Sequence, residues 1–294
     1  MPHSQNPPHP NSSAPWSAAL LRRDLNNRAL HHAVTQRLLH DQTPGNSPSV
    51  IFGHDEQSRH GNFHPASYAA ICANPQWRRR LAKTHTAHRK LRARADWEWK
   101  ELDCASSSDA LLMNIVCHPQ VATAESISAP IARLLGIDTN AAPVFGLHPG
   151  VPLRTGLLDR TEIDLQLDTL FVEAKLTESS FQKAKPRLIL RYRDLEEVFD
   201  VARLVPGDQP EIAIPGYQLI RNVLAAYASN AAFCVLCDAR RRDLIETWYR
   251  VLSAVYRPTF AARLKLLTWQ EFAAALPRDL HQFLETKYGI FPSV

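Results

Sequence analysis

The stretch from residue 160 to residue 176 constrains the fold most, because apolar and polar residues alternate on both sides of Asp168 and Thr169. A period of two is typical of a strand with one buried face. We therefore predict a hairpin of two antiparallel strands that turns at residues 168–169. A loop of two or four residues pairs residue 167 with residue 170, whereas a loop with an odd count would give a different register.

In this register, two acidic side chains face each other across the hairpin. Asp164 lies opposite Glu173, and Glu162 lies opposite Lys175. Directly opposed residues have Cβ atoms about 4.5–5.5 Å apart, where like charges destabilise a sheet. A divalent cation such as magnesium would remove the repulsion, since hard cations prefer carboxylate oxygens. Lys175 shares a face with Glu173, where it could hold a phosphate group or a water molecule.

The spacing of these residues resembles that of the PD-(D/E)xK nuclease superfamily, whose members share a restriction-endonuclease-like fold. In that motif an Asp on one strand is followed by (Asp/Glu)-x-Lys on the next, as Asp164 is followed by Glu173-Ala174-Lys175. The run 171–178 is especially similar to an uncharacterised bacterial subgroup. A Glu-x-Lys pattern is also common on exposed strands, so an exposed hairpin with an ion pair is the alternative interpretation.

Two further segments resemble the same subgroup. Residues 106–117 begin with three serines and Asp109 ahead of an apolar run, which predicts a serine-capped helix. Residues 217–227 also predict a helix, with polar residues at positions i, i+3 and i+4 of one face. Superfamily members often carry an acid on the first helix and a glutamine or a base on the second. A first-turn carboxylate and a polar outer face are the structural alternatives.

The resemblance implies a set of site residues and a cofactor. The catalytic residues would be Asp164, Glu173, Lys175 and Gln218, and the metal ligands would be Asp164, Glu173 and the backbone carbonyl of Ala174. The metal would be Mg²⁺, for which Mn²⁺ can substitute. Residues that support the site or contact phosphate would be Glu162, Arg221, Asn222 and Asp109.

Basic residues gather in two places, which favours a nucleic-acid partner. The net charge is +5 and the pI is about 9.0. No acid interrupts residues 77–95, and five bases follow the Glu-x-Lys strand between residues 183 and 193. Such residues neutralise phosphates irrespective of base sequence, although basic runs are also typical of solvated surfaces. With RNA left open as a substrate, we predict contacts to the DNA backbone by Arg78, Arg79, Arg80, Lys83, Lys183, Lys185 and Arg187.

The order of the predicted elements after residue 100 is the αβββαβ core of this superfamily, a mixed central sheet flanked by helices. The last strand of that core is predicted at residues 231–237. We predict a disordered tail at residues 1–13, a helical extension at 14–100 and a nuclease-like domain at 101–294. Within the extension, we expect helices at 14–41 and 68–102 with a polar loop between them.

Two groups of residues that could suggest metal binding have simpler interpretations. His54, Asp55, Glu56, His60 and His64 crowd the loop of the extension, but their spacing fits no ligand pattern. Cys234 and Cys237 lie three residues apart on a predicted strand, so their side chains point to opposite faces. We therefore expect a polar loop in the first case and core packing in the second.

The chain shows no apolar run near the ~18 residues of a membrane span and no secretory signal. Five cysteines do not suggest a disulfide scaffold. We expect a cytoplasmic protein without a membrane partner: a metal-dependent nuclease acting on DNA, for which paired cuts would favour a homodimer. A role in defence rests on analogy. The alternatives are a DNA-binding module with an unused nuclease core and an interaction protein with exposed hairpin acids.

Overall fold

The computed structural model of the chain describes residues 16–84, 99–205 and 211–293. The predicted tail at residues 1–13 and the bases at positions 89–94 lie outside these residues. A mixed five-stranded sheet forms the centre, in the order β11-β10-β7-β6-β3. Its strands are β3 (Pro143–Leu147), β6 (Ile163–Leu167), β7 (Leu170–Ala174), β10 (Ala232–Cys237) and β11 (Leu264–Thr268).

The sheet combines antiparallel and parallel pairs. β6 runs antiparallel to β3 and to β7, while β10 runs parallel to β7 and to β11. Apolar residues of β6 are buried alternately, as its sequence predicts, whereas every residue of β7 is buried. This difference arises because β7 lies in the middle of the sheet. The one acidic residue of β7, Glu173, is therefore buried in the protein interior.

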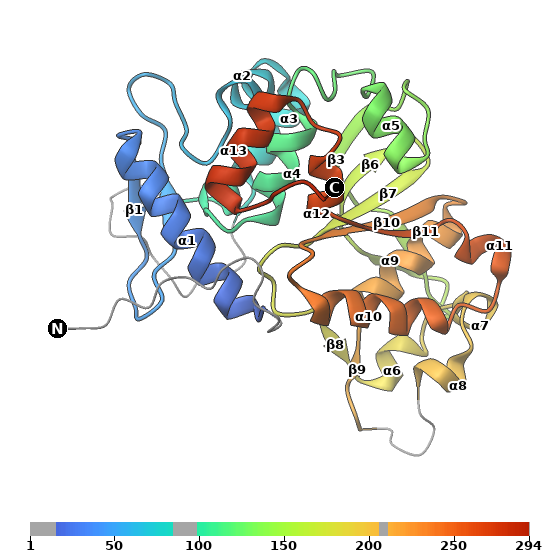
Figure 1. The fold of residues 1–294 in the computed structure, drawn as a ribbon. Helices are drawn as coiled ribbons and strands as arrows, with labels where there is room; N and C mark the ends of the chain where they lie inside the picture. The colour runs from blue at the N-terminus through green and yellow to red at the C-terminus, as the bar shows by residue number, and fades with distance from the viewer. Residues whose placement is uncertain (1–15, 85–98, 206–210, 294) are drawn as a thin grey trace.

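Helices cover both faces of the sheet (Figure 1). One face packs against α9 (Tyr217–Ala228), α10 (Arg242–Ser253) and three short helices, α6 (Pro186–Ile189), α7 (Leu195–Val198) and α8 (Val201–Leu204). The other face packs against α1 (Ala18–Thr35), α4 (Ser108–Val116), α5 (Ala129–Leu135), α12 (Trp269–Ala273) and α13 (Arg278–Tyr288). This mixed α/β architecture is compatible with the restriction-endonuclease-like fold that the sequence predicts.

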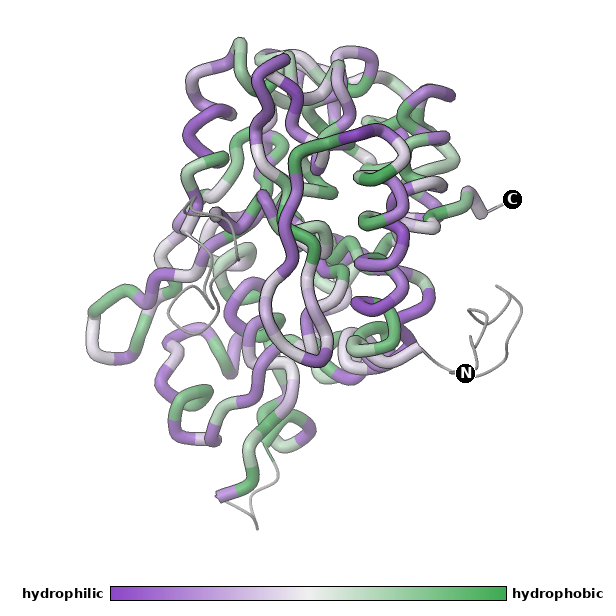
Figure 2. Tube along the Cα trace, turned by 90° about the vertical axis from the view of Figure 1, so that its left-hand side faces the viewer, coloured by the Kyte–Doolittle hydropathy of each residue, from purple (hydrophilic) through white to green (hydrophobic). Residues whose placement is uncertain are grey.

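The N-terminal part of the chain packs closely on this core. α1 lies along α13 (Figure 1). On the side of the molecule that carries α1, hydrophilic and hydrophobic residues alternate along the chain (Figure 2). The remaining elements of this part are β1 (His40–Gln42), β2 (Val50–Phe52), α2 (Pro65–Ala73), α3 (Pro75–Arg78) and the 3₁₀ helix η1 (Arg79–Ala82).

Three predictions of helix and loop boundaries were wrong. The first helix ends at Thr35, and the predicted loop after it contains the paired strands β1 and β2. The helix predicted from residue 68 breaks at Asn74, because Pro75 disfavours a helical conformation at the preceding residue. The Asn74 side chain instead caps α3. Residues 195–204 form two short helices, α7 and α8, with extended backbone at Phe199.

The other elements are short connections at the edges of the core. They are η2 (Glu101–Asp103), β4 (Gly150–Pro152), β5 (Leu158–Arg160), β8 (Lys183–Ala184), β9 (Ile214–Pro215) and α11 (Pro258–Ala261). β4 pairs with β5, and β8 pairs with β9. Among the described residues, no helix has both the length and the apolar character needed to cross a membrane.

The two cysteines of β10 lie on opposite faces of the sheet, as predicted. Cys234 packs in the core beside α4 and α13, and Cys237 packs in the core beside α9 and α10. Both thiols are free and completely buried. Burial raises the pKa of Cys234 to about 12, and it also raises that of Cys237.

We expect both thiols to resist alkylation in the folded protein, because the reactive thiolate is disfavoured and inaccessible. Native-state labelling followed by peptide mass spectrometry measures this, with the half-buried Cys72 as the internal control. Cys72 should be modified first, and Cys234 and Cys237 only after unfolding in denaturant. Rapid labelling of the β10 thiols under native conditions would contradict this packing.

Candidate active site

The hairpin has the register that its sequence predicts. Leu167 pairs with Leu170, and Leu165 pairs with Val172. The turn contains Asp168 with φ of 50°, a conformation that Asp tolerates better than most residues. Continued by one step, this register places Asp164 opposite Glu173. The backbone N–H of Ala174 donates to Asp164 Oδ2 at 2.9 Å, which holds the Asp164 carboxylate against β7.

Glu173 is buried and is held by three donors. Its Oε1 accepts from Lys175 Nζ at 2.5 Å and from Gln218 Nε2 at 2.6 Å. Its Oε2 accepts from Asn222 Nδ2 at 2.8 Å. The hydroxyl of Thr161 donates to Asn222 Oδ1 at 2.8 Å, which fixes the orientation of that amide. Two residues one turn apart on α9 therefore position the carboxylate.

Part of the polar face of α9 therefore points into the protein. The alternative interpretation, in which the whole polar face is exposed to solvent, is wrong. Gln218 and Asn222 contact Glu173, and Asn222 is completely buried. Arg221 points elsewhere, since its guanidinium donates to the carbonyl of Arg160 at 2.9 Å and lies 3.4 Å from Asp159. Arg221 therefore contacts β5 rather than the facing acids.

Burial and nearby negative charge oppose the ionisation of the two facing acids. Burial raises the pKa of Asp164 well above its usual range, and Glu173 and Asp109 raise it further. Burial also raises the pKa of Glu173, although Lys175 offsets part of the effect. Around Lys175, burial favours the neutral amine, but Glu173, Glu178 and Asp164 outweigh it and raise its pKa. Lys175 is therefore a fixed positive charge and not a general base.

Two neighbouring acids are neutralised by bases from the N-terminal part of the chain. Asp109, in the first turn of α4, accepts from Arg80 Nη2 at 2.9 Å and from Lys83 Nζ at 2.5 Å. Glu162 forms ion pairs with Arg80 at 2.5 Å and with Lys83 at 3.0 Å. Burial disfavours the charges of Asp109 and Glu162, but the two bases outweigh it and lower the pKa of both acids. Arg80 also lies 3.7 Å from Asp164.

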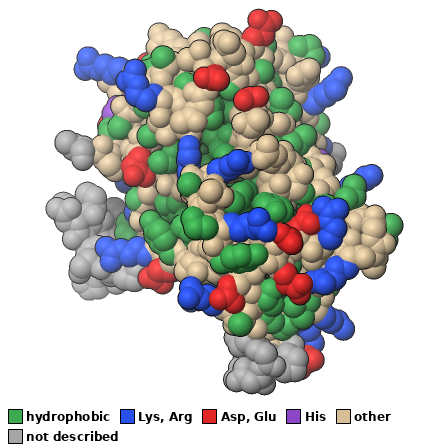
Figure 3. All heavy atoms as spheres, turned by 90° about the vertical axis from the view of Figure 1, so that its right-hand side faces the viewer, with side chains coloured by type: hydrophobic (Ala, Val, Ile, Leu, Met, Phe, Trp, Pro, Cys, Tyr) green, Lys and Arg blue, Asp and Glu red, His purple; other side chains and the backbone are tan. Residues whose placement is uncertain are grey.

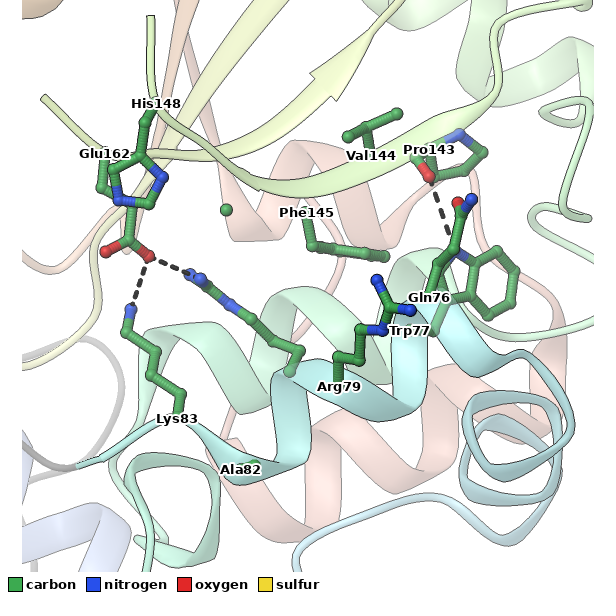
Figure 4. Close-up of a pocket in the computed structure, with 12 residues that line it drawn as sticks. Gln76, Trp77, Arg79, Ala82, Lys83, Pro143, Val144, Phe145, His148 and Glu162 are labelled. Atoms are coloured by element: carbon green, nitrogen blue, oxygen red, sulfur yellow. Dashed lines mark hydrogen bonds and ion pairs between the residues drawn. The ribbon is translucent and has the colours of Figure 1, made fainter. Parts of the chain in front are cut away.

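A cavity of about 680 Å³ opens beside this group. Glu162 and Lys83 point toward each other at one side of it, and Trp77 and Pro143 lie at the other (Figure 4). Arg79 and Arg80 also line the cavity. The cavity therefore reaches the cluster at Glu162 and at its two partners, Arg80 and Lys83.

The bases that were predicted to contact DNA do not lie together in the structure. Arg78 and Arg79 are exposed on α3 and η1, at the top of Figure 1. The remaining exposed bases of the predicted set lie at β8 and α6, at the bottom of Figure 1. They are Lys183, Lys185 and Arg187. Lys185 pairs with Glu211 at 2.6 Å. On the face shown in Figure 3, basic and acidic side chains are interspersed and form no continuous basic surface.

Sequence reasoning missed one acid of the site, Glu178. Its Oε1 accepts from the Ser108 hydroxyl at 2.5 Å, and its Oε2 accepts from the backbone N–H of Leu176 at 2.7 Å. It thereby joins α4 to the end of β7. In the sequence, its position three residues after Lys175 was the signal that could have identified Glu178. The sequence held no such signal for the ion pairs that Arg80 and Lys83 form with Asp109 and Glu162, because these residues are far apart along the chain.

The histidines of the extension do not gather into one site. His60 contacts Asp103 at 3.0 Å, and Asp55 pairs with Arg59. His64 and His118 lie 3.9 and 3.3 Å from Asp279, through Nε2 in each case. Both Nδ1 atoms accept backbone N–H groups, so each neutral ring carries its proton on Nε2. That tautomer suits an interaction with the Asp279 carboxylate better than ligation of a metal.

We expect Asp164→Asn to stabilise the metal-free protein by about 1–3 kcal/mol at pH 8, because it removes a buried carboxylate that lacks full compensation. An acid whose pKa is raised by folding destabilises the fold as pH increases above its unfolded pKa of about 3.9. The gain should therefore shrink toward pH 4.5. Urea unfolding in EDTA measures both values.

Asp138→Asn, an exposed substitution after α5, is the matched control and should change stability little at either pH. Equal effects of Asp164→Asn at both pH values, or a loss of stability at pH 8, would contradict the electrostatic interpretation.

Comparison with known proteins gives one match. No curated protein and no solved structure matches the chain significantly. A family model described as Restriction Endonuclease associating with ARP matches residues 37–289. The matched range includes β6, β7 and α9 as well as most of the N-terminal part, so the hairpin and the segment that carries Arg80 and Lys83 fall within one family unit. The chain belongs to this family of restriction endonucleases associating with ARP.

Proposed function

We propose that the protein is a metal-dependent nuclease that hydrolyses DNA phosphodiester bonds, in restriction or defence. Membership of a restriction-endonuclease family points to a nuclease. The observation that carries the finer proposal is the facing pair of Asp164 and Glu173, whose pKa values are both raised, beside the permanent charge of Lys175. Acids with raised pKa values and a specific charged partner are typical of functional sites.

The residues of the pair suit a hard divalent cation. Magnesium prefers oxygen ligands and is commonly held by one or two carboxylates. Asp164 and Glu173 would supply these oxygens, and the Ala174 carbonyl would add a third. Burial raises both pKa values, and the charge of Glu173 adds to the effect at Asp164; a bound cation would favour the ionised form of both acids. Mg²⁺ is the proposed metal, with Mn²⁺ as a substitute.

A bound metal ion would lower the pKa of a water molecule and offset charge on the phosphate. The side chains of the protein contribute orientation and further charge. Gln218 and Asn222 hold the Glu173 carboxylate in one rotamer. Lys175 remains protonated, so it orients the attacking water or offsets negative charge that develops on the phosphate.

The partner proposed is the DNA backbone, which the exposed bases Arg78, Arg79, Lys183, Lys185 and Arg187 would contact. RNA remains open as a substrate. Two cuts on opposite strands would require two copies of the chain, so we propose a homodimer as the cutting unit. The family description also names ARP as an associate, and an associated protein would supply target recognition.

We expect Mg²⁺-dependent cleavage of plasmid or linear DNA by the wild-type protein. Asp164→Ala and Lys175→Ala should each lower the rate by about 10²–10³, the range for removing one group that stabilises transition-state charge. A gel assay in Mg²⁺ with an EDTA blank measures this. Asp138→Ala, an exposed change, should cut at the wild-type rate.

Wild-type rates for Asp164→Ala and Lys175→Ala would show the assignment to be wrong. DNA binding without cleavage, together with no affinity for Mn²⁺ that depends on Glu173, would favour a non-catalytic DNA-binding module on the same fold. No salt-dependent DNA binding at all would favour an interaction protein.

The bases of β8 and α6 should contribute to binding through phosphates. Replacing Lys183, Lys185 and Arg187 by alanine should reduce the slope of log K against log salt by about 2–3, since each phosphate contact on duplex DNA contributes about 0.9. Fluorescence anisotropy with duplex DNA in EDTA measures the slope. Arg278→Ala, at the start of α13, is the control, and an unchanged slope in the triple variant would remove these bases from the interface.

A further inference from the structure

Arg80 and Lys83 occupy a defined place in the acidic cluster. They lie three residues apart at η1, and 3₁₀ geometry puts residues with this spacing on the same face. Each of them contacts both Asp109 and Glu162. The side chain of Arg80 is only 10% exposed, so it is built into the site rather than resting on the surface.

The strand next to β6 makes room for Arg80. Phe145 pairs with Leu165 and Leu147 with Ile163, so Gly146 lies beside Asp164 in the sheet. Gly146 has a φ of 68°, and a Cβ at this position would lie 2.4 Å from Arg80 Nη1. The absence of a side chain at Gly146 therefore allows the guanidinium to approach Asp164.

These ion pairs persist at neutral pH. Burial disfavours the charges of Arg80 and Lys83, but Asp109 outweighs it and raises the pKa of both bases, with help from Glu162 at Arg80 and from Asp164 at Lys83. The pKa values of Asp109 and Glu162 are lowered in return. Two acids and two bases thus neutralise each other. The remaining acids are the facing pair of Asp164 and Glu173, and Lys175 already pairs with Glu173 at 2.5 Å.

A single divalent cation is therefore enough to balance the remaining charge. Two-metal nucleases hold their ions about 3.5–4 Å apart and need carboxylate oxygens for both. Both oxygens of Asp109 accept from positively charged side chains, and Glu162 pairs with the same two bases. At Glu173, by contrast, Oε2 accepts from the neutral amide of Asn222 and only Oε1 accepts from a base, Lys175. A second cation at Asp109 and Glu162 would have to displace Arg80 and Lys83.

We propose that Arg80 and Lys83 take the place of a second metal ion, so that the site binds one divalent cation, at Asp164 and Glu173. This inference rests on the proposed metal site. The two bases reach the 680 Å³ cavity, where they supply positive charge to an entering phosphate. Within the described part of the chain, Arg80 Nε is buried and has no hydrogen-bond partner.

The number of bound ions tests the inference without reference to catalysis. Titration of the metal-free full chain with Mn²⁺, followed by calorimetry and by electron paramagnetic resonance of the free ion, should give one ion per chain. Arg80→Gln with Lys83→Gln should open a second, weaker site at Asp109 and Glu162. Arg78→Gln with Arg79→Gln removes the same charge from the same segment and should leave one ion.

Two ions in the wild type, or one ion in the folded Arg80 and Lys83 variant, would overturn the inference. Because that variant leaves Asp109 unpaired and could fold poorly, Glu162→Gln gives a second test. It should still bind one Mn²⁺ with an affinity changed by less than about threefold, and loss of the ion would overturn the inference. Unchanged binding by Asp164→Asn would instead overturn the proposed metal site itself.

Discussion

The site depends on two carboxylates that face each other on β6 and β7, adjacent strands of the central sheet. Lys175 pairs with Glu173 at 2.5 Å, whereas Arg80 lies 3.7 Å from Asp164. Here the Ala174 N–H holds Asp164 in place, and two amides of α9 hold Glu173. The surrounding structure therefore keeps an unfavourable arrangement of charge, which a divalent cation converts into a favourable one.

The N-terminal part of the chain contributes side chains to the site. Arg80 and Lys83 neutralise the two flanking acids, Asp109 and Glu162, so the unfavourable charge is confined to one place. Gly146 leaves the space that Arg80 needs. The family match, which begins at residue 37, is consistent with a site that draws on both parts of the chain.

Local patterns predicted the elements whose side chains follow a strict period. The alternation around Asp168 gave the hairpin and its register, and the spacing of Cys234 and Cys237 gave their opposite faces. Long-range partners could not be predicted, because no period connects Arg80 with Asp109. The resemblance placed Asn222 among the supporting residues of the site, whereas the period of α9 alone predicts a polar face toward solvent. The hydrogen bond from Asn222 to Glu173 explains why this polar residue points inward.

The most direct measurement of the central claim is the position of Mn²⁺ in crystals of the metal-loaded protein, from its anomalous scattering. We predict one strong peak between the carboxylates of Asp164 and Glu173, with Asp109 still paired to Arg80 and Lys83. A peak elsewhere, or none at a concentration that saturates binding in solution, would contradict it.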